Sequence, residues 1–359
     1  MSKFIKNGFY VILLLFVCAL NACEHSSLGP GQVDGQVKIV YSTDALNYLY
    51  IVDIDGSNNL PLVKLRERSV DVAWFPDASR IIYAERLGYS DRDTTYVWLF
   101  DLKTAQKSLL FVEWEYVPSQ FKVAPRGDKI AFRRYHIVNN VGQICVINVN
   151  GTDKLALTNT ASNSFPNWSP DGRKIVFVSG INENADICTI NPDGSDFRKL
   201  TDNPGIDSDP SFSPDGSQLV YRSRRNDQDA IVVMNVDGSH PRVIASPDST
   251  YCGHPVWSPD GTLIAFQQFV LRKGNRIFCM RTDGTEIRQL SREDGGGHYD
   301  PQWAPDGDKI VFLSNIINQP NLFVVDRNSG EQSQLTYLSS SESGGIQKYA
   351  ISPVLVTNY

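Results

Sequence analysis

Short runs of apolar or alternating residues, separated by turn residues, fill most of the chain. Residues 174–179 (KIVFVS), 218–221 (QLVY) and 309–314 (KIVFLS) are examples. Runs of this length and composition are typical of buried or half-buried strands. A variable loop follows each of them, then another apolar run such as 230–235, an Asp-Gly turn and a segment that ends in Leu-Thr or a similar pair. Together with the strand before the first turn, the pattern predicts four antiparallel strands per unit.

Two turn motifs recur along the chain and define these units. The first contains proline, and its occurrences are Trp74-Phe-Pro-Asp-Ala78, Val123-Ala-Pro-Arg-Gly127, Trp168-Ser-Pro-Asp-Gly172, Phe212-Ser-Pro-Asp-Gly216, Trp257-Ser-Pro-Asp-Gly261, Trp303-Ala-Pro-Asp-Gly307 and Ile351-Ser-Pro353. The second motif consists of Asp55-Gly56, Thr104-Ala105, Asn150-Gly151, Asp193-Gly194, Asp237-Gly238, Asp283-Gly284 and Ser329-Gly330. The prolines are 49, 45, 44, 45, 46 and 48 residues apart. Four-stranded units at such a period are blades of a β-propeller, so an all-β fold is expected.

The Pro-Asp-Gly motif has a physical reason. Proline fixes φ at the second position of the turn, Asp or Ser can bond the local backbone, and Gly accepts the positive φ that ends the turn.

The two ends of the chain complement each other. Residues 38–42 match the second strand of a unit with no proline motif before it, and the last motif, at Ser352-Pro353, has no second strand after it. A C-terminal first strand that pairs with N-terminal strands would complete a seventh blade and remove an exposed sheet edge. We therefore predict a seven-bladed propeller closed by both termini. Six blades are the alternative, if Ile351-Ser-Pro353 is a chance match in a frayed tail.

The N-terminal residues predict export. Lys3 and Lys6 precede an apolar run from Phe9 to Leu20, which is typical of a secretory signal and short for a membrane-spanning helix. Leu20-Asn21-Ala22-Cys23 resembles the bacterial lipobox, although Asn21 is not the usual small residue. We predict a lipoprotein signal peptide at 1–22, acylation of Cys23, a flexible tether at 23–36 and a propeller at 37–359. The acyl chains would hold the protein on the bacterial envelope, at its periplasmic or surface face; secretion without an anchor is the alternative.

The repeated turns also carry a family resemblance. Trp-Ser-Pro-Asp-Gly followed by an Asp-Gly-Ser hairpin resembles the TolB-type propeller repeats of bacterial envelope proteins, over about residues 37–359. The N-terminal partner domain of TolB is not seen, and seven rather than six repeats are visible. The resemblance therefore implies the fold and an envelope location, and a role in the Tol system does not transfer.

Composition narrows the function further. The chain has 34 Lys and Arg against 40 Asp and Glu, a net charge of −6, which argues against a general nucleic-acid binder. With 41% hydrophobic residues, 26 Gly and 19 Pro, helical bundles, coiled coils and disorder are poor fits. The cysteines of the body match no metal-ligand spacing, and we expect small buried apolar residues at Cys145, Cys188, Cys252 and Cys279.

The strand order predicts where a site would lie. Both turn motifs fall on one face, so the loops entering the first strand and joining the second to the third form the opposite, loop face. One residue per unit, the fifth before the motif proline, should converge at the mouth of a central channel. These channel-mouth candidates are Asp71, Gln120, Phe165, Asp209, His254, Asp300 and Lys348, with His298 close to Asp300.

A divalent cation is one hypothesis for this mouth. Asp209, His254 and Asp300, with His298 as a further candidate, combine carboxylate and imidazole groups that suit several metals. The alternative is that the aspartates cap turns and His254 bonds nearby backbone.

The same face gathers a basic rim. Its members are Arg133, Arg134, Arg222, Arg224, Arg225, Arg272, Lys273 and Arg276. Clustered arginines can present forked donors to carboxylates or phosphates, as on an anionic glycan or acidic peptide. The alternative is ordinary solubility, because Asp227 and Asp229 are close enough in sequence to neutralise part of the rim.

Catalytic signatures are scarce. The chain lacks a Gly-x-Ser-x-Gly elbow and a following α/β-hydrolase region. The sequence predicts a non-catalytic, monomeric, lipid-anchored scaffold without a cofactor, which binds a protein or glycan and touches the membrane only through its anchor. The alternative, from a weaker resemblance to oligogalacturonate lyases, is a metal-dependent lyase for acidic oligosaccharides. Of the histidines, His254 and His298 alone lie in equivalent loops of adjacent repeats.

Overall fold

A computed structural model describes residues 37–43, 47–88, 94–159, 162–181, 184–246, 251–293, 295–316, 320–338 and 346–351. These residues form strands and turns, and none of them is helical. Accordingly, no apolar helix of membrane-spanning length occurs within these ranges. The signal peptide, Cys23 and the tether lie outside the described residues.

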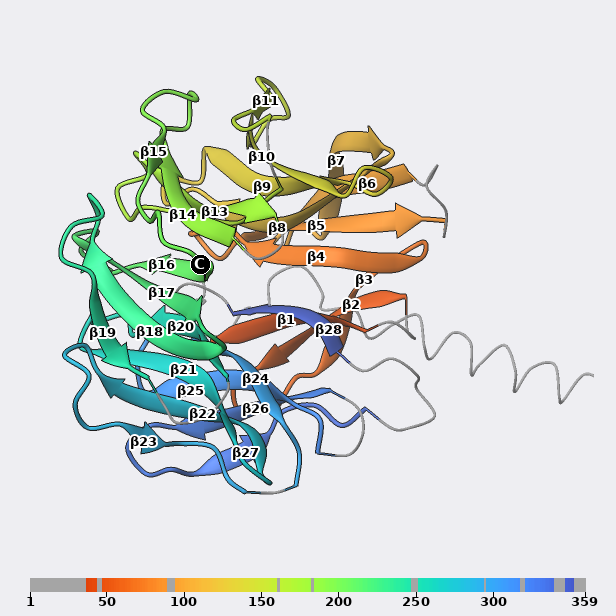
Figure 1. Ribbon diagram of the computed structural model, residues 1–359. Helices are drawn as coiled ribbons and strands as arrows, with labels where there is room; N and C mark the ends of the chain where they lie inside the picture. Colours follow the sequence, from red (N-terminus) through yellow and green to blue (C-terminus); the bar gives the residue numbers. More distant parts are fainter. Residues whose placement is uncertain are drawn as a thin grey trace, which may run out of the picture.

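Four-stranded antiparallel sheets follow one another along the chain (Figure 1). The first sheet contains both ends of the described chain, in the order β28 (Ile346–Ile351), β1 (Lys38–Thr43), β2 (Tyr48–Asp53) and β3 (Leu60–Lys64). The next comprises β4 (Arg68–Trp74), β5 (Arg80–Leu87), β6 (Thr94–Asp101) and β7 (Gln106–Trp114). It is followed by β8 (Tyr116–Val123), β9 (Lys129–His136), β10 (Val141–Asn148) and β11 (Leu155–Ala156).

The middle of the chain forms a larger sheet from two such units. Its members are β12 (Asn163–Trp168), β13 (Ile175–Ile181), β14 (Asn184–Ile190) and β15 (Arg198–Lys199), then β16 (Ile206–Phe212), β17 (Gln218–Arg225), β18 (Gln228–Asn235) and β19 (Arg242–Ala245). A single parallel pair, Ala185 with Ile206, joins the two units. The last two sheets are β20 (Cys252–Trp257), β21 (Leu263–Val270), β22 (Gly274–Arg281) and β23 (Arg288–Gln289), and β24 (His298–Trp303), β25 (Lys309–Ser314), β26 (Asn321–Asp326) and β27 (Gln332–Gln334).

The hydrophobic core lies between consecutive sheets. One cluster packs Val40 and Leu49 of the first sheet against Trp74 and Ile81 of the second. Another packs Ile39 of β1 against Val311 of β25, so the first and last sheets also share a core. This arrangement is consistent with a β-propeller, because each sheet buries both of its faces against neighbours.

The proline turns have the geometry that their residues predict. The N–H of Gly172 donates to the carbonyl of Ser169 at 2.8 Å, and Gly172 has a φ of 71°. The carboxylate of Asp171 accepts from the hydroxyl of Ser169 and the N–H of Arg173, and these bonds lower its pKa.

Tryptophans of the same motif connect neighbouring sheets. The indole N–H of Trp168 donates to the carbonyl of Lys122, and those of Trp257 and Trp303 donate to Ser211 and Val256. Each acceptor lies three residues before the motif proline of the preceding unit. Trp74 donates to Ala350 of β28 at 3.0 Å. Ala350 stands in the same relation to Pro353, so β28 contacts β4 as the other first strands contact theirs.

In four of the units, a hydroxyl after the fourth strand accepts a hydrogen bond from the third strand. Thr158, Thr201, Ser291 and Thr336 accept from the backbone N–H groups of Ile144, Ile187, Ile277 and Leu322 at 2.9–3.0 Å. The Leu-Thr signature of the sequence therefore caps a third-strand N–H that the short fourth strand leaves unpaired.

Candidate functional site

The channel-mouth candidates lie at a β-bulge in the first strand of their units. The register slips by one residue at this point in β4, β8, β12, β16, β20 and β24. Left-handed backbone occurs at five of the candidates, with φ of 50–57° at Gln120, Phe165, Asp209, His254 and Asp300. A bulge bends the strand and re-aims one side chain, and the side chains of Asp71, Gln120 and His254 contact the next sheet.

Two of the candidates form hydrogen bonds with the backbone of the next sheet. Asp71 accepts from the backbone N–H of Phe121, and Gln120 accepts from that of Phe165, both at 2.7 Å. Their side-chain oxygens are engaged in joining β4 to β8 and β8 to β12. For this pair the structural interpretation is therefore favoured over ligand binding.

The metal candidates come together only in part. His254 Nδ1 lies 3.1 Å from a carboxylate oxygen of Asp300, and both side chains are partly exposed. Asp209 accepts from the hydroxyl of Ser208 at 3.3 Å. Within the part of the chain that the structure describes, no three His, Cys, Asp or Glu side chains gather closely enough to hold a metal ion.

The remaining candidates do not extend this group. His298 is fully buried, with its ring 4.9 Å from that of Phe312, so it belongs to the packing of its sheet rather than to the solvent-facing mouth. Lys348 lies in β28, and its side chain is outside the described residues.

Most of the basic rim is paired within the protein. Ion pairs join Arg134 to Glu113, Arg222 to Asp229, Arg224 to Asp227, Arg225 to Asp207 and Lys273 to Glu293. Asp229 is fully buried, and its burial raises its pKa despite Arg222. For these five residues, neutralisation by nearby acids is the better interpretation. Arg133, Arg272 and Arg276 have no carboxylate partner among the described residues.

A pocket of about 420 Å³ lies where three of the rim residues meet. The loop joining β21 to β22 supplies Arg272 and Lys273, and β22 supplies Arg276. The opposite wall is Glu293 with the glycines 295–297 of the segment entering β24, and Tyr299 of β24 completes it. These are the two kinds of loop that the sequence predicts for the loop face.

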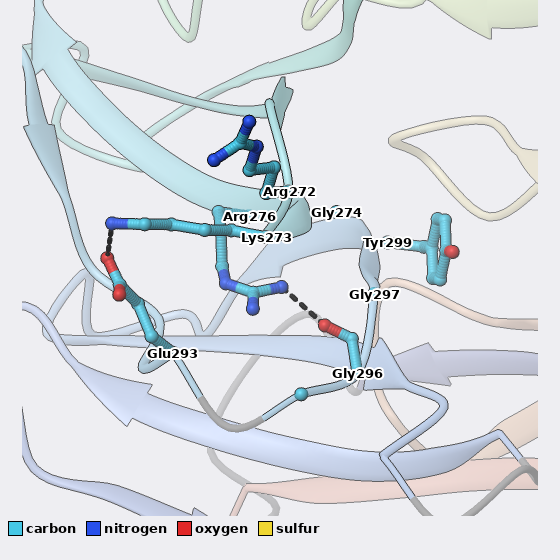
Figure 2. Close-up of a pocket in the computed structure, with 9 residues that line it drawn as sticks. Arg272, Lys273, Gly274, Arg276, Glu293, Gly296, Gly297 and Tyr299 are labelled. Carbon is cyan, nitrogen blue, oxygen red and sulfur yellow. Dashed lines mark hydrogen bonds and ion pairs between the residues drawn. The ribbon is translucent and has the colours of Figure 1, made fainter.

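Arg276 is the unusual member of this pocket. It is 1% exposed, and one of its terminal nitrogens donates to the carbonyls of Asn275, at 2.7 Å, and Gly296. Its Nε is buried and has no hydrogen-bond partner in the described structure. Figure 2 shows the guanidinium directed at Gly296, while Lys273 extends to Glu293. A buried cation without a counter-charge carries a desolvation cost of several kcal/mol.

Two of the glycines leave little room for a side chain. A Cβ on Gly296 would lie 2.6 Å from the backbone of Ile316, and one on Gly297 would lie 2.2 Å from the hydroxyl of Tyr299. Gly295 has a φ of 88°. The sequence analysis missed this wall, although three consecutive glycines before a first strand were a visible sign of close backbone approach.

A second pocket, of about 610 Å³, lies along β17–β19 and the segment after β15. Arg225, Tyr221 and Val232 are among its lining residues. Its charged lining residues Arg225 and Asp202 are both in ion pairs, with Asp207 and Lys199, so it brings together no group of unpaired charges.

The four described cysteines are free and buried, as expected of apolar fillers. Burial raises the pKa of Cys145, Cys188 and Cys252 to about 12, so these thiols are not nucleophiles near neutral pH.

Comparison with known proteins agrees with the fold. Residues 120–269 match the family described as the TolB beta propeller domain, so this segment consists of TolB-type propeller repeats. Dipeptidyl-peptidase 5 of Porphyromonas endodontalis is 30% identical over 126 residues, which is 33% of this chain and 17% of that protein. The chain thus corresponds to less than a fifth of that relative's length.

Solved structures extend the likeness across the chain. TolB from Acinetobacter baumannii superposes with a TM-score of 0.56 at 18% identity, covering 93% of this chain and 70% of TolB. An oligogalacturonate lyase in complex with manganese gives a TM-score of 0.64 at 17% identity, covering 82% of this chain and 84% of the lyase. At such identities the likeness establishes a shared β-propeller fold and nothing about activity.

Proposed function

We propose that this protein is a non-catalytic binding propeller of the bacterial envelope, held there by a lipid on Cys23. It binds a protein or glycan partner through the loop face, without a cofactor, and acts as a monomer. The observation that carries this proposal is the pocket of Arg272, Lys273 and Arg276, which gathers positive charge on one face of an acidic protein. Binding residues usually lie on loops held by a rigid scaffold.

A seven-bladed ring closed by both termini is part of the proposal. It is supported by the pairing of β28 with β1 and by the bond from Trp74 to Ala350, which repeats the contact between other sheets. Deletion of residues 346–359 should then abolish cooperative thermal unfolding, because β1 would lose its partner strand and a core contact. A six-bladed protein would tolerate the deletion with little change in melting temperature.

The binding role is tested on detergent-solubilised full-length protein. We expect it to bind members of a panel of acidic glycans and acidic peptides, and to bind less to the Arg272→Ser/Lys273→Ser variant. Arg173→Ser/Arg198→Ser, which removes two exposed cations from the turn face, is the control and should bind normally. Equal binding by all three proteins would exclude the pocket from partner recognition.

The lyase alternative makes a separate prediction. A lyase acting on a polyuronate leaves an unsaturated product that absorbs in the ultraviolet, whereas a scaffold leaves the absorbance unchanged. Elemental analysis of wild type and His254→Ala adds a second test. A metal lost with His254 would favour the lyase, because His254 and Asp300 form the one contact between the proposed metal ligands found among the described residues.

The anchor is tested at Cys23. Labelled palmitate should be incorporated by the wild type and not by Cys23→Ala, and the variant should leave the membrane fraction. Equal labelling of both would remove Cys23 as the lipid site.

A further inference from the structure

Arg276 occupies a recurring position at which three other units have a hydrogen-bond acceptor. The position immediately precedes the N–H that the Thr or Ser hydroxyl caps, and its other occupants are Gln143, Asp186 and Asn321. Gln143 accepts from Arg134, Asp186 accepts from Thr201, and Asn321 accepts from Thr336 and from the N–H of Leu338. In these units the side chain accepts a hydrogen bond from a residue of its own unit.

The arginine reverses this polarity. Arg276 cannot accept a hydrogen bond, so it donates to the carbonyls of Asn275 and Gly296 and keeps a buried Nε without a partner. No ion pair among the described residues includes it. The fold does not require a cation at this position, because Asn321 occupies the equivalent position in its unit and accepts two local hydrogen bonds there.

The surroundings of Arg276 complement an anion rather than a neutral molecule. Arg272 and Lys273 are exposed at the pocket edge, and Glu293 balances one of the three positive charges. A carboxylate or phosphate can take two bonds from one arginine fork and further charge from a lysine.

The size and lining favour a small polar ligand. A volume of about 420 Å³ lies in the range of small-molecule sites, roughly 300–1,000 Å³. Backbone of the glycine segment 295–297 lines one wall, and Figure 2 places the ring of Tyr299 beside Gly297. Aromatic and polar groups together suit a sugar, whose faces are apolar and whose edges carry hydroxyls.

We propose that this pocket binds the oxyanion of an acidic sugar, a carboxylate or a phosphate, with Arg276 as its principal donor. The proposal rests on the binding role proposed above and specifies its ligand chemistry. The sugar can be free or can end a glycan chain, since both present the same group.

The test compares three sugars that differ in one group. Binding of galacturonate, galactose 6-phosphate and galactose to the full-length protein is measured by calorimetry at constant ionic strength. We expect the two acids to bind and galactose not to bind. The phosphate and carboxylate arms then identify which oxyanion is preferred.

The decisive variant is Arg276→Asn, which installs the side chain that the unit of Asn321 uses. Its affinity for the acids should fall by on the order of tenfold or more, the value of a lost charged hydrogen bond. Arg242→Asn is the matched control, because Arg242 also donates to two backbone carbonyls, those of Thr282 and Asp283, but beside the Asp-Gly turns. It should bind the acids as the wild type does. Thermal melting of each variant establishes that it is folded.

Several outcomes would overturn the inference. Equal affinity of Arg276→Asn and wild type, or equal binding of galactose and galacturonate, would exclude Arg276 as an oxyanion donor. If the sugars fail while an acidic peptide or long glycan binds the loop face, the ligand assignment is wrong and the proposed binding function stands. If no acidic partner binds at all, both proposals fail.

Discussion

Asn321 in β26 and Arg276 in β22 occupy the same place in adjacent sheets and have opposite roles. Both are almost fully buried, and both precede an N–H that is capped by a hydroxyl. Asn321 accepts two hydrogen bonds and closes its strand end, whereas Arg276 donates to the wall of a pocket. The repeat therefore accommodates either a hydrogen-bond acceptor or a donor at this position. Replacing the acceptor by a donor turns a structural position into a candidate binding position.

The largest effect on stability is expected when an arginine replaces Asn321. Asn321→Arg would bury a cation whose neighbours, Thr336 and the N–H of Leu338, both lose their acceptor. We expect a loss of about 3–5 kcal/mol of unfolding free energy, measured by urea denaturation. Asn328→Arg, at an exposed turn, is the control and should change stability by less than about 0.5 kcal/mol. A mild effect at position 321 would mean that this position accepts either polarity.

A smaller effect is expected at the glycines 295–297, which line the pocket of Arg276. Gly296→Ala would place a Cβ 2.6 Å from the backbone of Ile316, which must shift. Overpacking of this kind costs about 1–3 kcal/mol, and the carbonyl that Arg276 contacts would move. Gly295→Ala meets nothing within 4 Å, so its cost is limited to the strain of a φ of 88°. Equal melting temperatures of the two variants would contradict this account of the wall.

The capping hydroxyl of Thr336 should contribute more to stability than that of Ser291. Thr336 accepts from Leu322 and donates to Asn321, while Ser291 accepts from Ile277 without an acceptor side chain beside it. Thr336→Val removes both bonds, and we expect it to cost about 2 kcal/mol. Ser291→Ala removes one bond and should cost about 1 kcal/mol. Chemical denaturation of the two variants measures the difference, and a greater cost at Ser291 would reverse the comparison.

The sequence was sufficient for the repeated elements and insufficient for their exceptions. Turns such as Ser169-Pro-Asp-Gly172 determine local backbone by themselves, and the Trp and Leu-Thr positions recur, so the strands and the loop face could be predicted. The channel-mouth residues were predicted from spacing alone, and spacing does not reveal the β-bulge at which most of them lie. Asp71 and Gln120 therefore contact the next sheet rather than a ligand.

The basic rim shows the same limit in its electrostatics. The sequence shows two arginines at positions 134 and 276, and only their tertiary contacts show which of them has an acidic partner. Glu113 of β7 approaches Arg134 at 2.9 Å, while no described carboxylate approaches Arg276. Alignment of the units on the capping hydroxyl, rather than on the proline, would have identified Arg276 as the one cation among acceptors.

The smallest effect on stability, and the most informative, is expected when asparagine replaces Arg276. In Arg276→Asn the new amide oxygen can accept from Ser291, as Asn321 accepts from Thr336, and a buried uncompensated charge disappears. The carbonyl of Gly296 loses its donor but borders the pocket, where water can replace it. These changes oppose one another, so unfolding free energy without ligand should change by less than about 1 kcal/mol. A protein that needs Arg276 for folding would instead lose several kcal/mol, and the position would then be structural in both units.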